Sequence, residues 1–151
     1  MIQALLSNKV LMALLTAWFL AQALKVPIHY YVNKKMNYSL WFSSGGMPSS
    51  HSALMMAATL TIGMYYGFES PLFALAVAVS MVVLYDAAGV RRQAGFHAQR
   101  INTIIEELRK GNPFPQRPLK EMLGHSPKQV LVGSILGIVV ALAYYFLWPP
   151  A

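Results

Sequence analysis

The chain contains no cysteine, which excludes disulfide bridges, thiolate nucleophiles and cysteine-based metal sites. Acidic residues are also scarce: five Asp and Glu stand against twelve Lys and Arg in 151 residues. Charged residues make up only 11% of the chain and hydrophobic residues 56%. This composition is typical of a membrane protein, here with one domain spanning 1–151. Basic clusters with interleaved aromatic residues are absent, so nucleic-acid binding is unsupported.

Long apolar runs predict an all-α integral membrane protein with about four transmembrane helices, at 10–27, 52–68, 71–90 and 128–148. Crossing a bilayer takes about 20 residues, with a range near 17–25, so the second run is marginal. The first run resembles a signal peptide, and we interpret it as a retained membrane helix that Pro27 ends or bends. A further segment, near 97–110, has apolar residues at helical spacing and predicts an amphipathic helix on the membrane surface.

The positive charges predict how the bundle is oriented. Segment 25–50 holds Lys25, Lys34 and Lys35 without an acid, and segment 91–128 holds eight further Lys or Arg. The other loops carry only Lys9 and Glu69. The positive-inside rule then predicts a multi-pass plasma-membrane protein with both basic segments in the cytoplasm and both termini outside.

This topology brings chemistry-bearing residues to one face. Lys25 lies at the end of the first run, His51 starts the second, Arg91 and Arg92 follow the third, and His125 precedes the fourth. Because successive helices alternate in direction, all of these residues are expected at the same membrane surface. Ionisable residues at a membrane edge usually mark a function.

The stretch Ser43-Ser44-Gly45-Gly46-Met47-Pro48-Ser49-Ser50-His51-Ser52 is suited to an anion. Glycines allow close backbone approach, serines supply donors, and the first turn of a helix presents unpaired N–H groups to negative charge. We therefore expect Ser49 and Ser50 to bind phosphate beside His51. The alternative is an ordinary serine-capped helix start with an incidental histidine.

Together these residues are the set that phosphoryl transfer needs. Arginine binds phosphate oxygens bidentately and lysine binds them as a point charge. One imidazole could attack phosphorus while the other protonates the leaving alkoxide. Lys25 could equally be an anchor whose ammonium reaches the interface, and the two arginines could simply end the third helix.

The order of these motifs resembles the short, divergent branch of the type 2 phosphatidic acid phosphatase superfamily, related to acid phosphatases and vanadium-dependent haloperoxidases. That superfamily carries K-x6-R-P, P-S-G-H and S-R-x5-H-x3-D; here Pro48-Ser49-Ser50-His51 resembles the second motif. His125-Ser126-Pro127-Lys128-Gln129 resembles the end of the third, and Tyr85 to Arg92 resembles a detached form of its arginine.

The resemblance implies a role for each residue. His125 would be the nucleophile and His51 the general acid, with Ser49 and Arg91 or Arg92 as phosphate ligands and Lys25 in place of the first-motif lysine. Family members of this kind need no metal, so no cofactor is expected.

The chain departs from the family pattern at the nucleophile. Gln129 stands where the family has the aspartate that orients and charge-stabilises the histidine. A glutamine can hold imidazole by a hydrogen bond but adds no charge. Glu121, four residues before His125, could compensate, and Asp86 is the other candidate, unless it pairs with Arg91 or Arg92. A metal site from His51, Asp86, Glu121 and His125 is conceivable, but no ligand spacing supports it.

The sequence thus predicts a membrane lipid-phosphate phosphatase, metal-independent, that acts at the cytoplasmic face on a phosphatidate- or phosphatidylglycerophosphate-like monoester. Its partner is a phospholipid in the bilayer, and a homodimer is plausible because four helices enclose such a site thinly. Two alternatives stay open: a non-catalytic lipid-phosphate binding or transport protein, and a helix-bundle scaffold.

Overall fold

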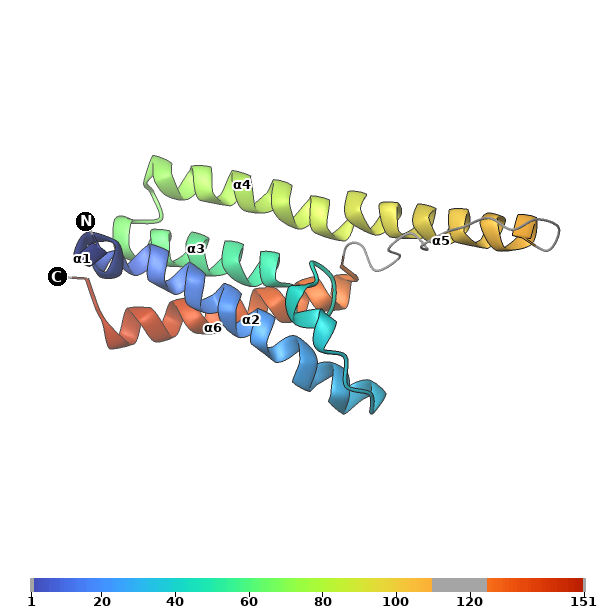
Figure 1. The fold of residues 1–151 in the computed structure, drawn as a ribbon. Helices are drawn as coiled ribbons and strands as arrows, with labels where there is room; N and C mark the ends of the chain where they lie inside the picture. The colour runs from blue at the N-terminus through green and yellow to red at the C-terminus, as the bar shows by residue number, and fades with distance from the viewer. Residues whose placement is uncertain (1, 110–124, 151) are drawn as a thin grey trace.

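The computed structural model describes residues 2–109 and 125–150, and these residues form an all-helical bundle (Figure 1). A short α1 (Ile2–Ser7) precedes the long α2 (Lys9–Asn33), and a 3-10 helix, η1 (Tyr38–Phe42), leads to α3 (Ser50–Tyr66). Then follow α4 (Pro71–Ala88), α5 (Val90–Arg109) and α6 (Pro127–Leu147). The all-α membrane fold expected from the sequence is confirmed.

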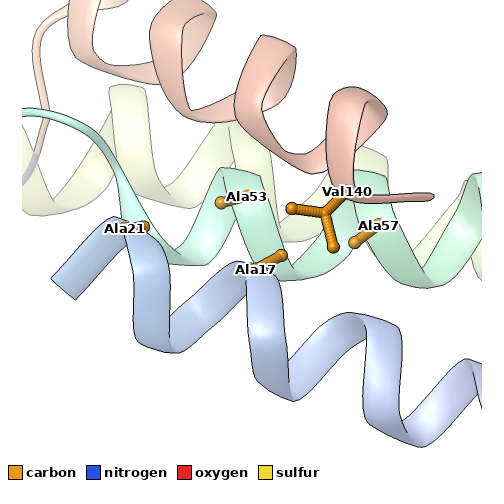
Figure 2. Packing of buried hydrophobic residues seen from close by; sticks show 5 residues of the cluster. All are labelled: Ala17, Ala21, Ala53, Ala57 and Val140. Carbon is orange, nitrogen blue, oxygen red and sulfur yellow. The ribbon is translucent and has the colours of Figure 1, made fainter. Parts of the chain in front are cut away.

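Helix α3 is the centre of the bundle and packs against α2, α4 and α6. Its buried side chains are small, which lets the neighbouring backbones come close. Figure 2 shows the result at the junction of α2, α3 and α6, where Ala17, Ala21, Ala53, Ala57 and Val140 form the apolar core.

The contact between α3 and α6 depends on two glycines four residues apart. A Cβ atom on Gly133 would overlap the carbonyl oxygen of Ser49, and one on Gly137 would overlap that of Ala53. This is the small-xxx-small spacing that brings membrane helices into backbone contact. It sets the starts of α3 and α6 side by side, which fixes the distance between the two histidines described below.

The structure does not confirm the predicted number of membrane crossings. Among the described residues, three helices are long and apolar enough to span: Lys9–Asn33, Pro71–Glu106 (α4 continued into α5) and Pro127–Leu147. α3 has 17 residues, a length of about 26 Å at 1.5 Å per residue, below the roughly 30 Å of bilayer hydrocarbon. The predicted four spans are therefore not confirmed, although the two chain ends lie together at one end of the bundle (Figure 1).

Of the two effects predicted for Pro27, an end to the first helix is wrong, because α2 continues to Asn33. A proline cannot donate to the carbonyl four residues before it, which here belongs to Ala23. That carbonyl accepts a hydrogen bond from the indole Nε1 of Trp41 instead, at 3.3 Å. The tertiary contact replaces the missing helical bond, so the helix passes through the proline.

The amphipathic segment also begins earlier than predicted. Helix α5 starts at Val90, with only Gly89 between it and α4, and extends in line with α4 beyond the bundle (Figure 1). Within the described residues it contacts α4 and no other helix. The predicted range 97–110 therefore covers the second half of a longer helix, and its last residue lies outside the part described.

Candidate phosphate site

The loop before α3 and the first turn of α6 are joined at Ser49. Its side chain caps α3, where Oγ accepts from the Ser52 backbone N–H (3.3 Å) and from the Ser52 hydroxyl (2.9 Å). Its own N–H donates to the carbonyl of Gln129 at 3.0 Å. Ser49 and Ser50 are both buried. Ser49 thus serves as a helix cap, as the alternative interpretation expected, while its own hydroxyl proton can still be donated to a ligand.

The structure brings His51 and His125 together from separate helices. Their ring centroids are 5.9 Å apart and the rings meet edge to face. His51 lies in the first turn of α3, and His125 precedes α6, with its backbone N–H donating to the Ala87 carbonyl at 2.9 Å. The end of α4 therefore holds one histidine and the start of α3 carries the other, at one end of the bundle.

Gln129 determines which nitrogen of His125 carries the proton. Its Oε1 accepts from the Ser126 N–H at 3.0 Å, and this bond identifies the atom as the amide oxygen. The same Oε1 lies 3.3 Å from Nδ1 of His125, so Nδ1 must be the donor. Nε2 then bears a lone pair; it is buried and has no hydrogen-bond partner within the described residues.

The surroundings of His125 favour its neutral form. The residue is 1% exposed, and this burial lowers the pKa of the imidazole to about 4. Nearby His51 and Lys25 lower the pKa further, whereas the bond to Gln129 and the backbone of Gly46 raise it. At neutral pH the ring is therefore uncharged, which is the state in which Nε2 can act as a nucleophile.

Lys25 is fully buried, at 0% exposed, rather than extended to the interface. Its Nζ donates to the carbonyl of Ser43 at 2.6 Å. Gln22, one turn earlier, donates to the same carbonyl at 3.2 Å and to that of Trp41 at 2.6 Å. No carboxylate pairs with Lys25 in the described part of the chain, so its charge is buried without compensation and close enough to His125 to affect its titration.

The structure describes the other predicted site residues only in part. Asp86 is half-buried in the last turn of α4, next to the carbonyl that holds His125. Arg91 and Arg92 lie in the first turn of α5, and Glu121 falls outside the described residues. The roles of all these residues stay predictions. Within 2–109 and 125–150, no three His, Asp or Glu side chains are grouped so that they could hold a metal ion.

Sequence reasoning did not anticipate the Ser43 carbonyl, which joins Gln22 and Lys25 to the loop. The one signal in the sequence was Gln22, which lies one turn from Lys25 in an otherwise apolar run. Residues at this spacing lie on the same helix face, so their polar groups can reach the same partner.

Comparison with known proteins identifies the family of the chain. Residues 6–140 match the model of a family described as the divergent PAP2 family. The chain is 39% identical over 156 residues to the "Uncharacterized membrane protein YuiD" of Bacillus subtilis (strain 168), covering 95% of this chain and 99% of that protein. No solved structure matches. The matched region contains all the residues of the histidine site, and the chain belongs to the divergent PAP2 family of membrane proteins.

Proposed function

We propose that this protein is a lipid-phosphate phosphatase that forms a phosphohistidine intermediate. The observation that carries the proposal is a buried cation, Lys25, without a counter-charge in the described structure, beside a neutral imidazole whose Nε2 has no partner there. Burying an uncompensated ammonium costs several kcal/mol, which a bound anion would offset. A phosphate monoester supplies that anion and also an electrophile for Nε2.

The proposed reaction has two steps. Nε2 of His125 attacks phosphorus, the bond to the lipid oxygen breaks, and His51 gives its proton to the leaving alkoxide. Water then attacks phosphorus, the phosphorus–Nε2 bond of His125 breaks, a proton of the water returns to His51, and inorganic phosphate is released. Lys25 and the N–H groups at the start of α3 would stabilise the charge on the phosphoryl oxygens in both steps.

An apolar cavity supports a lipid substrate. It measures about 570 Å³, lies along α2 and η1, and is lined mainly by the apolar side chains of Trp18, Phe19, Trp41 and Phe42. Gln22 belongs to its wall and also holds the Ser43 carbonyl that Lys25 binds. An acyl chain in this cavity would therefore end beside the site where the phosphate is expected.

The identity of the lipid, the side of the membrane and the oligomeric state are part of the same proposal. Phosphatidate and phosphatidylglycerophosphate would present their phosphate at headgroup level, which is where we propose that the histidine pair lies. The distribution of Lys and Arg supports a cytoplasmic site in the plasma membrane with both termini outside. A homodimer would thicken the wall around the site.

The rival proposal is a lipid-phosphate binding or transport protein without turnover. Gln129 favours it, because a glutamine fixes the His125 tautomer but adds no negative charge to an imidazolium. The two proposals share the anion site and differ only in whether His125 is phosphorylated.

The deciding experiment measures phosphate release from short-chain lipid phosphates by purified protein in EDTA. We expect release by the wild type, and loss of it in His51→Ala and His125→Ala, with His97→Ala, an exposed histidine on α5, as the matched control. Acid-labile labelling of His125 by radioactive substrate would identify the intermediate. Binding of lipid phosphate without release would favour the rival, and release that survives both substitutions would remove the phosphohistidine mechanism.

A further inference from the structure

We propose that residues 35–45, the segment that contains η1, form a lid over Lys25, and that a lipid phosphate opens this lid by entering through the apolar cavity between α2 and η1. The inference rests on the lipid-phosphate ligand of the proposed function but not on turnover. It makes the lid the element that selects a phosphate carrying an acyl chain over a water-soluble phosphate ester.

The proposed phosphate site is closed in this structure. Lys25 is 0% exposed and His125 is 1% exposed, so water reaches neither side chain. The lid contributes to the closure directly, because the carbonyl of Ser43 accepts from the Lys25 ammonium at 2.6 Å. Gly46, which follows the lid, lies so close that a Cβ there would be 3.7 Å from Cδ of Lys25. The lid is therefore the part that moves when an anion takes the place of the Ser43 carbonyl.

The lid is attached to a single turn of α2. Gln22 donates to the carbonyls of Trp41 (2.6 Å) and Ser43 (3.2 Å), and Lys25 donates to the carbonyl of Ser43. In the opposite direction, the indole of Trp41 donates to the carbonyl of Ala23. Among the described helices, η1 contacts α2 alone. Breaking these bonds would free the lid while the packing of α3 on α6 stays in place.

Both ends of the lid have the backbone geometry of a hinge. Lys34 ends α2 with a φ of 54°, and Gly46 has a φ of 92°. Hinge motions are absorbed at such loop and element-terminal positions, and glycine changes φ at little cost. Between the two ends, Tyr38 and Phe42 are exposed aromatic side chains of the kind that favours the membrane interface. The lid can therefore move within that interface without bringing new apolar surface into water.

The apolar cavity leads to the residues that hold the lid closed. Trp41 and Phe42 of the lid form one wall of the cavity, and Gln22 belongs to the wall on α2. Gln22 also shares the Ser43 carbonyl with Lys25, so one carbonyl group separates the end of the cavity from the ammonium.

An acyl chain in the cavity would hold its own phosphate next to that carbonyl. The effective concentration of the phosphate there is then high, and its exchange with the carbonyl on Lys25 becomes an intramolecular step. A water-soluble phosphate ester lacks this anchor and must compete with the carbonyl from solution.

The test uses the absence of cysteine from the chain, because a single introduced thiol then reports on the lid alone. Ser43 is 7% exposed, and Ser43→Cys keeps the carbonyl that Lys25 binds. The experiment measures the rate at which a membrane-permeant maleimide labels this variant in detergent micelles. The probes are decylphosphonate, which has a chain and an anion that cannot be transferred, methylphosphonate, which has the anion only, and decyltrimethylammonium, which has the chain with a cation. We expect saturating decylphosphonate to speed labelling about tenfold or more, and the other two probes, at the same concentration, to leave the rate unchanged.

A second substitution in the Ser43→Cys protein weakens the closed lid without a ligand. Trp41→Phe keeps an aromatic ring in the cavity wall and removes the hydrogen bond to the Ala23 carbonyl. Labelling without any probe should become about fivefold faster, the effect of one lost hydrogen bond. Trp18→Phe, the same change in the α2 wall of the cavity, is the matched control and should leave the rate unchanged.

Equal acceleration by methylphosphonate and decylphosphonate would overturn entry through the cavity, and acceleration by decyltrimethylammonium would overturn the exchange of anion and carbonyl. No acceleration by any probe, or an unchanged rate in Trp41→Phe, would overturn the lid. Because labelling needs no turnover, the outcomes are separable from those of the phosphatase assay. A lid that opens for decylphosphonate in a protein that releases no phosphate supports this inference and refutes the phosphatase, whereas phosphate release with a lid that does not respond refutes this inference alone.

Discussion

Replacing Lys25 with methionine separates the two explanations of this buried lysine. Lys25→Met keeps most of the side-chain volume and removes the charge and the hydrogen bond to the Ser43 carbonyl. If the lysine binds phosphate, the substitution should weaken catalysis without harming the fold. If the lysine instead anchors the loop before α3, the substitution should destabilise the fold and leave the catalysis of folded molecules unchanged.

The magnitudes follow from its surroundings. Losing a hydrogen bond from a charged donor costs about 1.5–3 kcal/mol of stability. Removing an ammonium that is 0% exposed and lacks a carboxylate partner in the described structure recovers several kcal/mol of desolvation free energy. The net change in the free energy of unfolding should therefore be near zero or stabilising. The same contact, made to a phosphate, is worth about 1.5–3 kcal/mol, so kcat/KM should fall between about tenfold and a hundredfold.

The assay combines thermal unfolding in detergent micelles with kcat/KM for short-chain phosphatidate. Lys9→Met is the matched control, because Lys9 lies at the other end of the bundle, over the Trp148 ring at 5.4 Å. A melting temperature that drops by many degrees, with kcat/KM per folded molecule unchanged, would refute the phosphate role of Lys25.

Three other substitutions or conditions have defined outcomes. Burial lowers the pKa of His125 to about 4, so kcat/KM should fall on the acid side only near pH 4, where the ring becomes protonated and loses its lone pair. A fall near the ordinary value of 6.5 would contradict the burial of His125. The same depressed pKa means that stability declines as the pH falls from about 6.5 to about 4, since the unfolded state binds the proton first. Gln129→Leu removes the acceptor that fixes the His125 tautomer and opens the capping box of α6, so kcat should fall on the order of a hundredfold and stability by about 1 kcal/mol; an unchanged kcat would show that the tautomer is irrelevant. Gly133→Ala places a methyl group against the Ser49 carbonyl and should cost about 1–3 kcal/mol in thermal or denaturant unfolding, whereas the exposed Leu131→Ala should not.

Apolar periodicity and composition were enough to predict the fold class and the approximate helices. The wrong predictions concern places where a contact between residues distant in sequence overrides the preference of the local sequence. Pro27 reads as a helix end, but Trp41, fourteen residues later, supplies the missing donor to Ala23. Gly89 separates two helices that continue in one direction, and no local signal distinguishes that arrangement from a bend onto the membrane surface.

The candidate site, too, could be predicted from the sequence only in part. Alternating helix direction predicts that Lys25, His51 and His125 share one end of the bundle, and the structure places them there. What Lys25 binds could not be predicted, because its partner is a backbone carbonyl, Ser43, whose position depends on how the loop folds. The tautomer of His125 likewise depends on the rotamer of Gln129, which the sequence does not encode locally.

Gln129 stands where the superfamily motif that the sequence resembles has an aspartate, and the structure indicates what that difference would change. An aspartate there would add negative charge next to His125 and raise its pKa, and it would partly neutralise the field of Lys25 at the same site. With glutamine, the neutral imidazole keeps a fixed tautomer and the charge of Lys25 remains available to an incoming anion. The dianionic substrate would then supply the negative charge that stabilises the imidazolium-like nitrogen after attack. Under the proposed mechanism, the glutamine would therefore shift charge stabilisation from the protein to the substrate, and this would favour phosphate binding at the expense of the rate at which His125 attacks.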